Sequence, residues 1–336
     1  MSKYLFIFFV IIAASAAFAG GYKIDRVINV GPAEWVPKER PVKFSPDGSR
    51  VAYFYQGFLR ISDTLGLDYA ASMDSTIYPV WYEWLSNDEI IWQRQILRNV
   101  TAVRRLGIID VNSGEERTII EDNQPVYYGA SGDAGSFLGP HLTVEGNAYY
   151  IIDQPDIFDV VIPSGEYTSG NRSLAEADNH ILLWGKDGLY MVRADLGDST
   201  RLTRKPYARI NLHPAISYDR EYILMGGLLE HLADSSYLIL DTLIKDNLPT
   251  AFGCGILYGS FNPTAPEILF QVGCPDDQDY LANHIATYDY DAELLISIDS
   301  LANLTNCVGP AYSPDGRMIS FISNDTAYIA FRVFLK

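Results

Sequence analysis

The chain has 336 residues, of which 42 are acidic and 25 are Lys or Arg, and its formal net charge is −17. Because a field of this sign repels phosphate backbones, the composition argues against nucleic acid as a partner. Aromatic residues make up 13% of the chain, and Gly and Pro interrupt short apolar or alternating runs throughout. This pattern is typical of an all-β fold.

Residues 1–19 have the pattern of a secretory signal peptide. Lys3 supplies a positive charge, an apolar run follows, and Ala17-Phe18-Ala19 forms a small-x-small cleavage site. The apolar run is shorter than the ~20 residues that a spanning helix needs. We therefore predict an exported protein, periplasmic or secreted, whose mature part has no transmembrane segment. Loss of Lys3 with the leader changes the net charge from −17 to −18.

Two copies of one motif define the organisation of the remaining chain. They are Phe44-Ser-Pro-Asp-Gly48 and Tyr312-Ser-Pro-Asp-Gly316, and in both an apolar strand pattern follows the glycine. Pro sets φ for a turn, Asp accepts hydrogen bonds from the turn backbone, and Gly adopts positive φ. Each copy therefore predicts a strand, a tight turn and a second antiparallel strand. We interpret Asp47 and Asp315 as turn residues rather than metal ligands.

Weaker copies keep the same spacing and predict a ring of blades. The leading residues of all copies are Phe44, Trp84, Tyr128, Leu174, Ile216, Phe261 and Tyr312, with gaps of 40, 44, 46, 42, 45 and 51 residues. A four-stranded propeller blade needs ~40–50 residues. We predict one β-propeller domain over residues 20–336, with seven four-stranded blades. Merging the Tyr128 and Leu174 copies gives six blades as the alternative.

The last copy lacks an outer strand before the chain ends at Lys336. The alternating run from Tyr22 to Val30 lies just before the first copy, so we predict that it supplies this strand and closes the ring.

The two complete motifs resemble the WD40-like (PD40) repeats of the TolB-like β-propeller family. This resemblance covers most of the mature chain, and it implies a periplasmic protein that binds other proteins. Related propellers also occur as the non-catalytic domain of prolyl oligopeptidase-like and tricorn-like proteases. TolB itself resembles a six-bladed propeller, whereas the spacing here favours seven.

Catalytic and metal-binding signatures are sparse. The chain has no Gly-x-Ser-x-Gly nucleophile elbow, and its five His residues show no His-Glu-x-x-His spacing. Three carboxylates, those of Asp276, Asp277 and Asp279, could supply oxygen ligands to Ca²⁺. The segment lacks the Gly and distal Glu of an EF-hand loop, and a solvated acidic loop is the favoured interpretation.

Three cysteines, Cys254, Cys274 and Cys307, fall late in the chain. In a propeller all three are expected on one rim of neighbouring blades, the rim opposite the motif turns. An exported protein favours oxidation. We predict one disulfide that includes Cys274, with Cys254 preferred over Cys307 as its partner. A three-cysteine metal site is the alternative.

The same rim is predicted to carry the longest loops, and loops on a rigid scaffold are where binding concentrates. Trp84 and Trp92 occupy strand positions and are predicted to be core. Trp35 and Trp81 are candidates for surface contacts, with a core position as the alternative. The predicted loops are Pro32–Arg40, Gln95–Arg104, Gly226–Asp234 and Gly273–His284.

Two functions follow from these patterns. The first is an exported, non-enzymatic scaffold that binds a protein or peptide partner through loops on one face. The second is a propeller hydrolase or lyase that acts on a sugar or lactone at the channel mouth, either with Ca²⁺ or, as favoured for this chain, with no cofactor. The missing catalytic signatures favour the first, and the oligomeric state stays open.

Overall fold

The structure is a computed structural model that describes residues 21–34, 42–56, 58–66, 68–69, 78–84, 86–98, 101–122, 129–131, 136–143, 146–153, 156–157, 160–161, 167–174, 180–185, 189–193, 199–202, 214–225, 227–247, 255–275, 281–298 and 302–334. In several of these strands only the backbone is described.

The described residues form seven antiparallel sheets, which follow one another in chain order. The first two contain β2 (Val42–Phe44), β3 (Arg50–Tyr55), β4 (Phe58–Asp63) and β5 (Asp68–Tyr69), then β6 (Tyr78–Trp84), β7 (Glu89–Arg98), β8 (Thr101–Asp110) and β9 (Glu116–Asp122). The next two contain β10 (Gly129–Ser131), β11 (Ser136–Thr143), β12 (Gly146–Asp153), β13 (Asp156–Ile157) and β14 (Val160–Val161), then β15 (Tyr167–Leu174), β16 (His180–Gly185), β17 (Leu189–Arg193) and β18 (Ser199–Arg201).

The last three sheets carry the better described side chains. They contain β19 (Pro214–Ile216), β20 (Tyr222–Met225), β21 (Leu228–His231) and β22 (Tyr237–Ile239), then β23 (Gly255–Phe261), β24 (Glu267–Pro275), β25 (Leu281–Asp289) and β26 (Leu294–Ser297), and finally β27 (Cys307–Tyr312), β28 (Met318–Ser323), β29 (Thr326–Phe334) and β1 (Tyr22–Pro32). The helix α2 (Leu240–Asn247) follows β22 directly.

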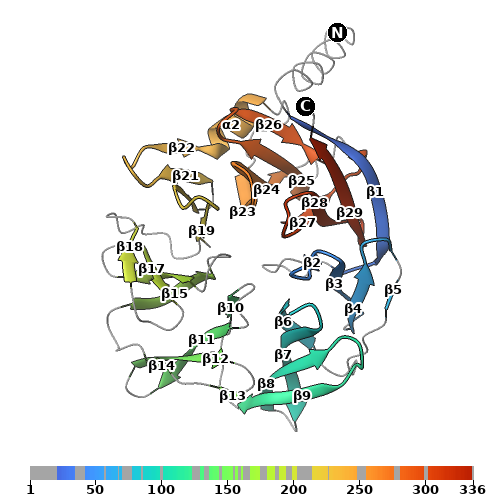
Figure 1. Ribbon diagram of the computed structural model, residues 1–336, viewed down its shortest axis with the longest axis vertical. Coiled ribbons are helices and arrows are strands. Elements are labelled where there is room, and N and C mark those ends of the chain that lie inside the picture. The colour runs from blue at the N-terminus through green and yellow to red at the C-terminus, as the bar shows by residue number, and fades with distance from the viewer. Residues whose placement is uncertain are drawn as a thin grey trace.

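The sheets are arranged around a common centre, as Figure 1 shows. In six sheets the first strand in the chain lies nearest the centre and the later strands lie further out, and in the last sheet β27 is nearest the centre and β1 is at the outside. This arrangement of blade-like sheets is that of a β-propeller.

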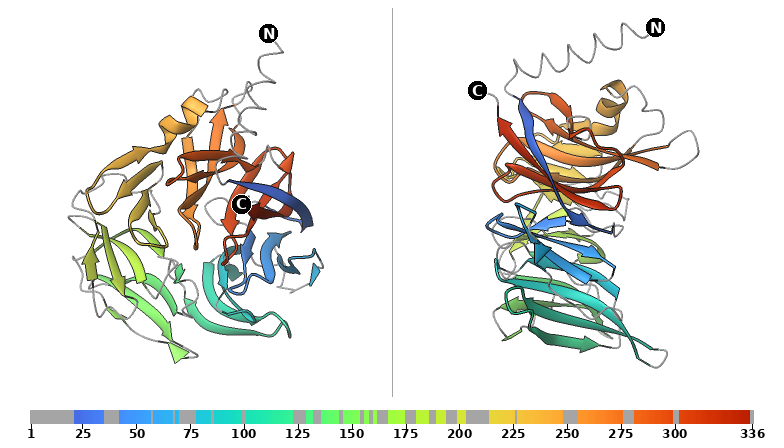
Figure 2. Two further views of the ribbon diagram at one scale, coloured as in Figure 1. Left: turned by 45° about the horizontal axis from the view of Figure 1, so that its top comes forward. Right: turned by 90° about the vertical axis from the view of Figure 1, so that its right-hand side faces the viewer.

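The two ends of the chain meet in one sheet, whose strand order is β1-β29-β28-β27. β1 pairs antiparallel with β29 from Tyr22 opposite Phe334 to Pro32 opposite Thr326. Figures 1 and 2 show the two strands side by side. The sequence prediction that the N-terminal run supplies an outer strand to the last repeat is therefore confirmed.

The predicted repeat positions coincide with the innermost strands. Each of these strands ends at its predicted leading residue in six sheets, at Phe44, Trp84, Leu174, Ile216, Phe261 and Tyr312. Tyr128 lies outside the described residues, and β10 begins directly after it. The segments after Tyr128 and up to Leu174 belong to two separate sheets.

The motif turn is held by a short hydrogen-bond network. Ser45 Oγ donates to Asp47 Oδ1 over 2.7 Å, and the backbone N–H of Ser49 donates to the same oxygen over 3.0 Å. The N–H of Arg50 in turn donates to Ser45 Oγ over 3.0 Å. Ser and Asp thus satisfy the turn backbone, which confirms the structural role predicted for Asp47.

The same network recurs in two other sheets. Ser313 Oγ donates to Asp315 Oδ1 over 2.6 Å, and Ser217 Oγ donates to Asp219 Oδ1 over 2.5 Å. The third copy has Arg220 where the complete motifs have Gly, yet it keeps the left-handed backbone with φ 63°. The Ser and Asp side chains therefore preserve the turn without the motif's glycine.

The turns also join neighbouring sheets. The N–H of Asp47 donates to Asn87 Oδ1 in the next sheet over 2.9 Å. Thr264 Oγ1 donates to the carbonyl oxygen of Asp315 over 3.3 Å. A rim of turn-to-turn contacts therefore reinforces the packing between the sheets.

The hydrophobic core lies between the sheets. Each of the four clusters of buried residues in the described part draws side chains from two neighbouring sheets. Trp84 and Trp92 are buried in the cluster between the β2–β5 and β6–β9 sheets, as predicted. Trp81 lies in β6, but its side chain is not described, and Trp35 lies outside the described residues.

Three predicted loops contain strand. The segment Gln95–Arg104 mostly extends a hairpin, because β7 runs to Arg98 and β8 begins at Thr101. The segment Gly226–Asp234 contains β21, which is paired on both sides. The segment Gly273–His284 is also part strand, since β24 runs to Pro275 and β25 begins at Leu281.

The two motif glycines provide a matched test of the contacts between the turns. Both have φ near 70°, where Ala costs about 1–2 kcal/mol. A Cβ on Gly48 would lie 3.5 Å from its nearest neighbour, whereas one on Gly316 would overlap Asn262 Oδ1 and lie 2.8 Å from Thr264 Oγ1. We expect Gly316→Ala to lower the free energy of unfolding more than Gly48→Ala, measured by urea denaturation. Equal losses would contradict the close packing at Gly316.

Candidate binding site

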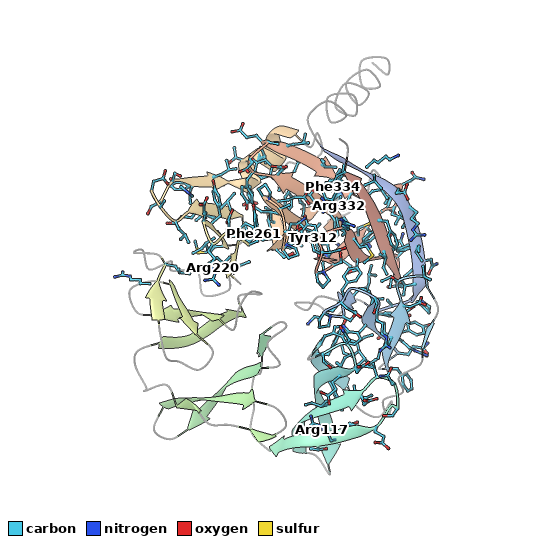
Figure 3. All side chains as sticks on the ribbon, in the orientation of Figure 1. Arg117, Arg220, Phe261, Tyr312, Arg332 and Phe334 are labelled. Carbon is cyan, nitrogen blue, oxygen red and sulfur yellow. The ribbon has the colours of Figure 1, made fainter. Side chains whose placement is uncertain are left out.

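A buried ion pair joins the last two sheets. Arg332 Nη2 donates to Glu267 Oε2 over 2.7 Å, and the two side chains are 0% and 7% exposed. Arg332 Nη1 donates to the carbonyl oxygen of Gly316 over 3.1 Å, and Tyr312 donates its hydroxyl to Glu267 Oε1. Figure 3 shows Tyr312, Arg332 and Phe334 close to one another in this part of the structure.

Burial dominates the electrostatics of this cluster. Burial and the Glu267 charge raise the pKa of Tyr312 well above its usual value, and they also raise that of Tyr22. The pKa of Glu267 is raised by burial, although Arg332 opposes the shift. The guanidinium also lies 3.8 Å from the ring centroid of Tyr22. These groups pair with one another and connect the last two sheets, while Arg332 Nε has no hydrogen-bond partner among the described residues.

A second buried polar network connects the same two sheets. Gln271 Nε2 donates to Asn283 Oδ1 over 2.9 Å, and the N–H of Gly309 donates to Gln271 Oε1 over 2.8 Å. Asn283 Nδ2 donates to Asn306 Oδ1 over 3.1 Å. This network also pairs protein groups with one another, and it is structural.

An open pocket lies between the β19–β22 sheet and the end of β25. Its volume is about 390 Å³, within the ~300–1,000 Å³ range of ligand pockets. It is lined by Tyr222, Leu229, His231, Ser236, Tyr237, Leu238, Leu243, Tyr288, Tyr290 and Glu293. Tyr222 follows the Ser217–Asp219 turn, so the pocket opens at the rim of the motif turns. That rim is opposite the one on which binding was predicted.

Aromatic rings form one wall of this pocket. The ring centroids of Tyr222 and His231 are 4.9 Å apart, and those of Tyr222 and Tyr290 are 4.6 Å apart. Tyr222 is directly opposite His231 in the β20–β21 register, so both side chains project from the same face of the sheet. Phe261 supports Tyr290 edge-on at 6.1 Å.

The pocket has an acidic surround. Glu293 lines it, and none of the described lining residues is Lys or Arg. The pKa of Tyr222 is raised by burial first, and then by the charges of Asp291 and Glu221. The pKa of Tyr290 is likewise raised by burial and by the charge of Asp219.

The strand β22 borders the pocket and is the last strand of its sheet. Its residues Tyr237, Leu238 and Ile239 are 62%, 37% and 47% exposed. The N–H of His231 donates to the Ser236 carbonyl, and the N–H of Leu240 donates to the Gly227 carbonyl. Because hydrogen-bonded pairs alternate along an antiparallel ladder, the backbone groups of Ile239 face away from β21.

The predicted site residues are only partly described. Trp35, Cys254, Asp276, Asp277 and Asp279 lie outside the described residues, and Cys274 lies in β24 with its side chain undescribed. Cys307 is fully buried in β27, within the cluster that also contains Phe321. The disulfide, the Ca²⁺ site and the roles of Trp35 and Trp81 therefore stay predictions.

Sequence reasoning missed the pocket because its residues come from segments that turn signals separate. The aromatic residues of Tyr218-Asp-Arg-Glu-Tyr222 and Tyr288-Asp-Tyr290 flank turns and alternate with acidic residues. That pairing of Tyr with acidic residues at two turns is the signal that could have indicated it.

The described residues lack a metal-binding cluster and a membrane-spanning helix. They contain no group of three or more His, Cys, Asp or Glu placed to hold a metal ion. In the same part of the chain, we found no helix with the length and apolar character needed to cross a bilayer.

Comparison with known proteins shows the fold alone. No protein-family model and no curated protein matches the chain. A chain of the crystal structure of the Mitotic Checkpoint Complex is similar over 93% of this chain and 94% of its own, with 14% identity and a TM-score of 0.59. The tricorn protease is similar over 93% of this chain, with 11% identity and a TM-score of 0.54, and this chain spans 35% of its length. TolB from Acinetobacter baumannii is similar over 86% of this chain and 78% of its own, with 13% identity and a TM-score of 0.47.

Two tyrosines test which buried hydroxyl contributes to stability. The Tyr290 hydroxyl is buried and has no hydrogen-bond partner among the described residues, whereas that of Tyr312 donates to Glu267. We expect Tyr312→Phe to lower the free energy of unfolding by about 1–3 kcal/mol, because it leaves a buried carboxylate oxygen unpaired. Tyr290→Phe should leave it unchanged or raise it by up to about 1 kcal/mol. Chemical denaturation measures both, and a loss for Tyr290→Phe would show that its hydroxyl is paired.

The carboxylate of Asp234 beside the pocket should titrate unusually low. Hydrogen bonds from the side chain and N–H of Ser236, and then from His231, lower its pKa from 3.8 to about 2. This contribution to stability is present above the unfolded pKa and is lost as the pH falls towards 2. Carbon NMR of the carboxyl group should show this midpoint, and Ser236→Ala should raise it. A midpoint near 3.8 in the unsubstituted protein would contradict the hydrogen-bond network.

Proposed function

We propose that this chain is an exported, non-enzymatic β-propeller that binds an extended peptide segment of a partner protein along the outer edge of β22. The proposal includes membership of the TolB-like group of propellers with WD40-like repeats, which the two complete motifs support. Export rests on the signal-peptide pattern of residues 1–19.

The proposal also includes seven blades in a ring that β1 closes. Seven sheets in chain order among the described residues support this number. The pairing of β1 with β29 supports closure, because it joins the first strand of the chain to the last sheet.

The observation that carries the binding proposal is the exposed apolar edge of β22. Native proteins usually protect sheet edges with charged residues, proline or a covering segment, because an open edge pairs readily with another strand. Here Tyr237, Leu238 and Ile239 are successive apolar residues, and all three are exposed. Recognition by strand addition uses such an edge for backbone hydrogen bonds and a neighbouring pocket for side-chain specificity.

The pocket provides that second element. Leu238 and Ser236 border both the edge and the pocket, so a peptide strand beside β22 would place side chains at the pocket mouth. The aromatic lining suits such a contact, because Tyr rings offer large apolar area with a polar tip.

Proline at position 239 tests the edge. Ile239→Pro removes an outward-facing N–H and leaves the β21–β22 bonds in place, because proline is tolerated on the open side of an edge strand. Peptides selected from a random display library on the wild-type protein should lose at least about tenfold in affinity for this variant, through a lost hydrogen bond and steric blocking. Fluorescence anisotropy provides the measurement.

Two further variants serve as controls. Ile239→Thr keeps the backbone donor and should retain most of the affinity. Leu65→Thr changes an exposed apolar residue in another sheet and should have no effect. If the library yields no binding peptide, or if selected peptides bind Ile239→Pro as well as wild type, the proposed function is wrong.

A further inference from the structure

We infer that the pocket beside β22 binds a Lys or Arg side chain of the peptide, so that the protein selects basic extended segments. This inference rests on the proposed function and specifies its ligand. It follows from the strand register, from the aromatic wall and from the charges around the pocket.

The register places one peptide side chain at the pocket. Tyr222 in β20 is opposite His231 in β21, and the N–H of His231 donates to the carbonyl oxygen of Ser236, the residue just before β22, so the three residues form one row. A strand added at the β22 edge extends this row by one residue. Its side chain lies on the same face, with its Cβ about 4.5–5.5 Å from that of Ser236.

The pocket wall suits a cation in particular. The ring of Tyr222 is tilted by 36° against that of His231 and by 45° against that of Tyr290, so two tyrosine rings stand at this wall. The face of a tyrosine ring is electronegative and attracts a cation. A Lys ammonium or Arg guanidinium within ~6 Å of the centroid of such a ring is attracted by the ring quadrupole. The aliphatic stem of either side chain can pack against Leu229 and Leu238, which also line the pocket.

The acidic residues around the pocket disfavour an acidic peptide side chain there. Glu293 lines the pocket, and Asp219, Glu221 and Asp291 are close enough to raise the pKa of Tyr222. Arg220 belongs to the same turn as Asp219 but does not line the pocket. The chain as a whole has a net charge of −17, so a basic segment is attracted and an acidic one is repelled.

The test uses peptides selected from the random library on the wild-type protein. We expect them to share one Lys or Arg at a fixed position, flanked by residues that favour extended backbone. Replacing that residue with norleucine should weaken binding about fivefold to thirtyfold, and replacing it with Glu should weaken it further. The affinity for the basic peptide should also fall as the salt concentration rises.

Variants of the protein identify the residues that produce the preference for Lys over norleucine. Tyr222→Leu removes a ring and should reduce the preference for Lys over norleucine, whereas Tyr222→Phe should retain most of it. Glu293→Gln should reduce the same preference, and Glu115→Gln, an exposed acidic residue in the β8–β9 turn, should not. The preference is a ratio of two affinities for one variant, so a general loss of stability does not mimic it.

The outcomes separate the two proposals. If selected peptides depend on the β22 edge but bind equally well with Lys or norleucine, the peptide-binding function stands and the cation pocket is wrong. If basic peptides bind but Tyr222→Leu and Glu293→Gln keep the full preference, the cation binds elsewhere and the inference is overturned. Failure to select any peptide overturns the proposed function itself.

Discussion

Each sheet in this fold is narrow, and the apolar side chains on its two faces are removed from water only by packing against a neighbouring sheet. All four buried clusters in the described part lie between two sheets rather than within one. A sheet of four short strands buries too little apolar area to be stable alone. The fold is therefore stable through its contacts between sheets, and the polar groups at those contacts are part of its stability.

The Glu267–Arg332 pair is one contact between sheets in which the loss of a single partner is costly. Both charges are buried, and the carboxylate also accepts from Tyr312 while the guanidinium also donates to Gly316. Loss of one partner in such a pair costs about 3–5 kcal/mol, because the other charge remains buried without compensation. The open pocket lies at the neighbouring contact, between the β19–β22 and β23–β26 sheets. There the aromatic side chains that pack between the two sheets are partly exposed to solvent.

Local turn chemistry explains how much of the fold could be predicted. The Ser and Asp side chains act within five residues, so the strand before each turn could be located even at Ser217-Tyr218-Asp219, where Pro and Gly are missing. The β7–β8 hairpin differs from the loop predicted for Gln95–Arg104, because cross-strand pairing extends both strands beyond the point that the repeat spacing indicates. Tyr beside acidic residues at two turns is a local signal for the pocket, but its position depends on residues near 222, 237 and 290 that meet only across two sheets.

The union of β1 with β29 has a consequence for the order in which the molecule forms. The hydroxyl of Ser320 donates a hydrogen bond to the carbonyl oxygen of Val42, which lies 278 residues earlier in the chain. β1 can pair only once β29 has been synthesised. Contacts between such distant segments are slow to form, because a large loop must close before they contribute any stability. Until synthesis reaches β29, β1 has no strand to pair with, and its open backbone is exposed to other chains. The pairing of β1 with β29 is therefore a late event in folding.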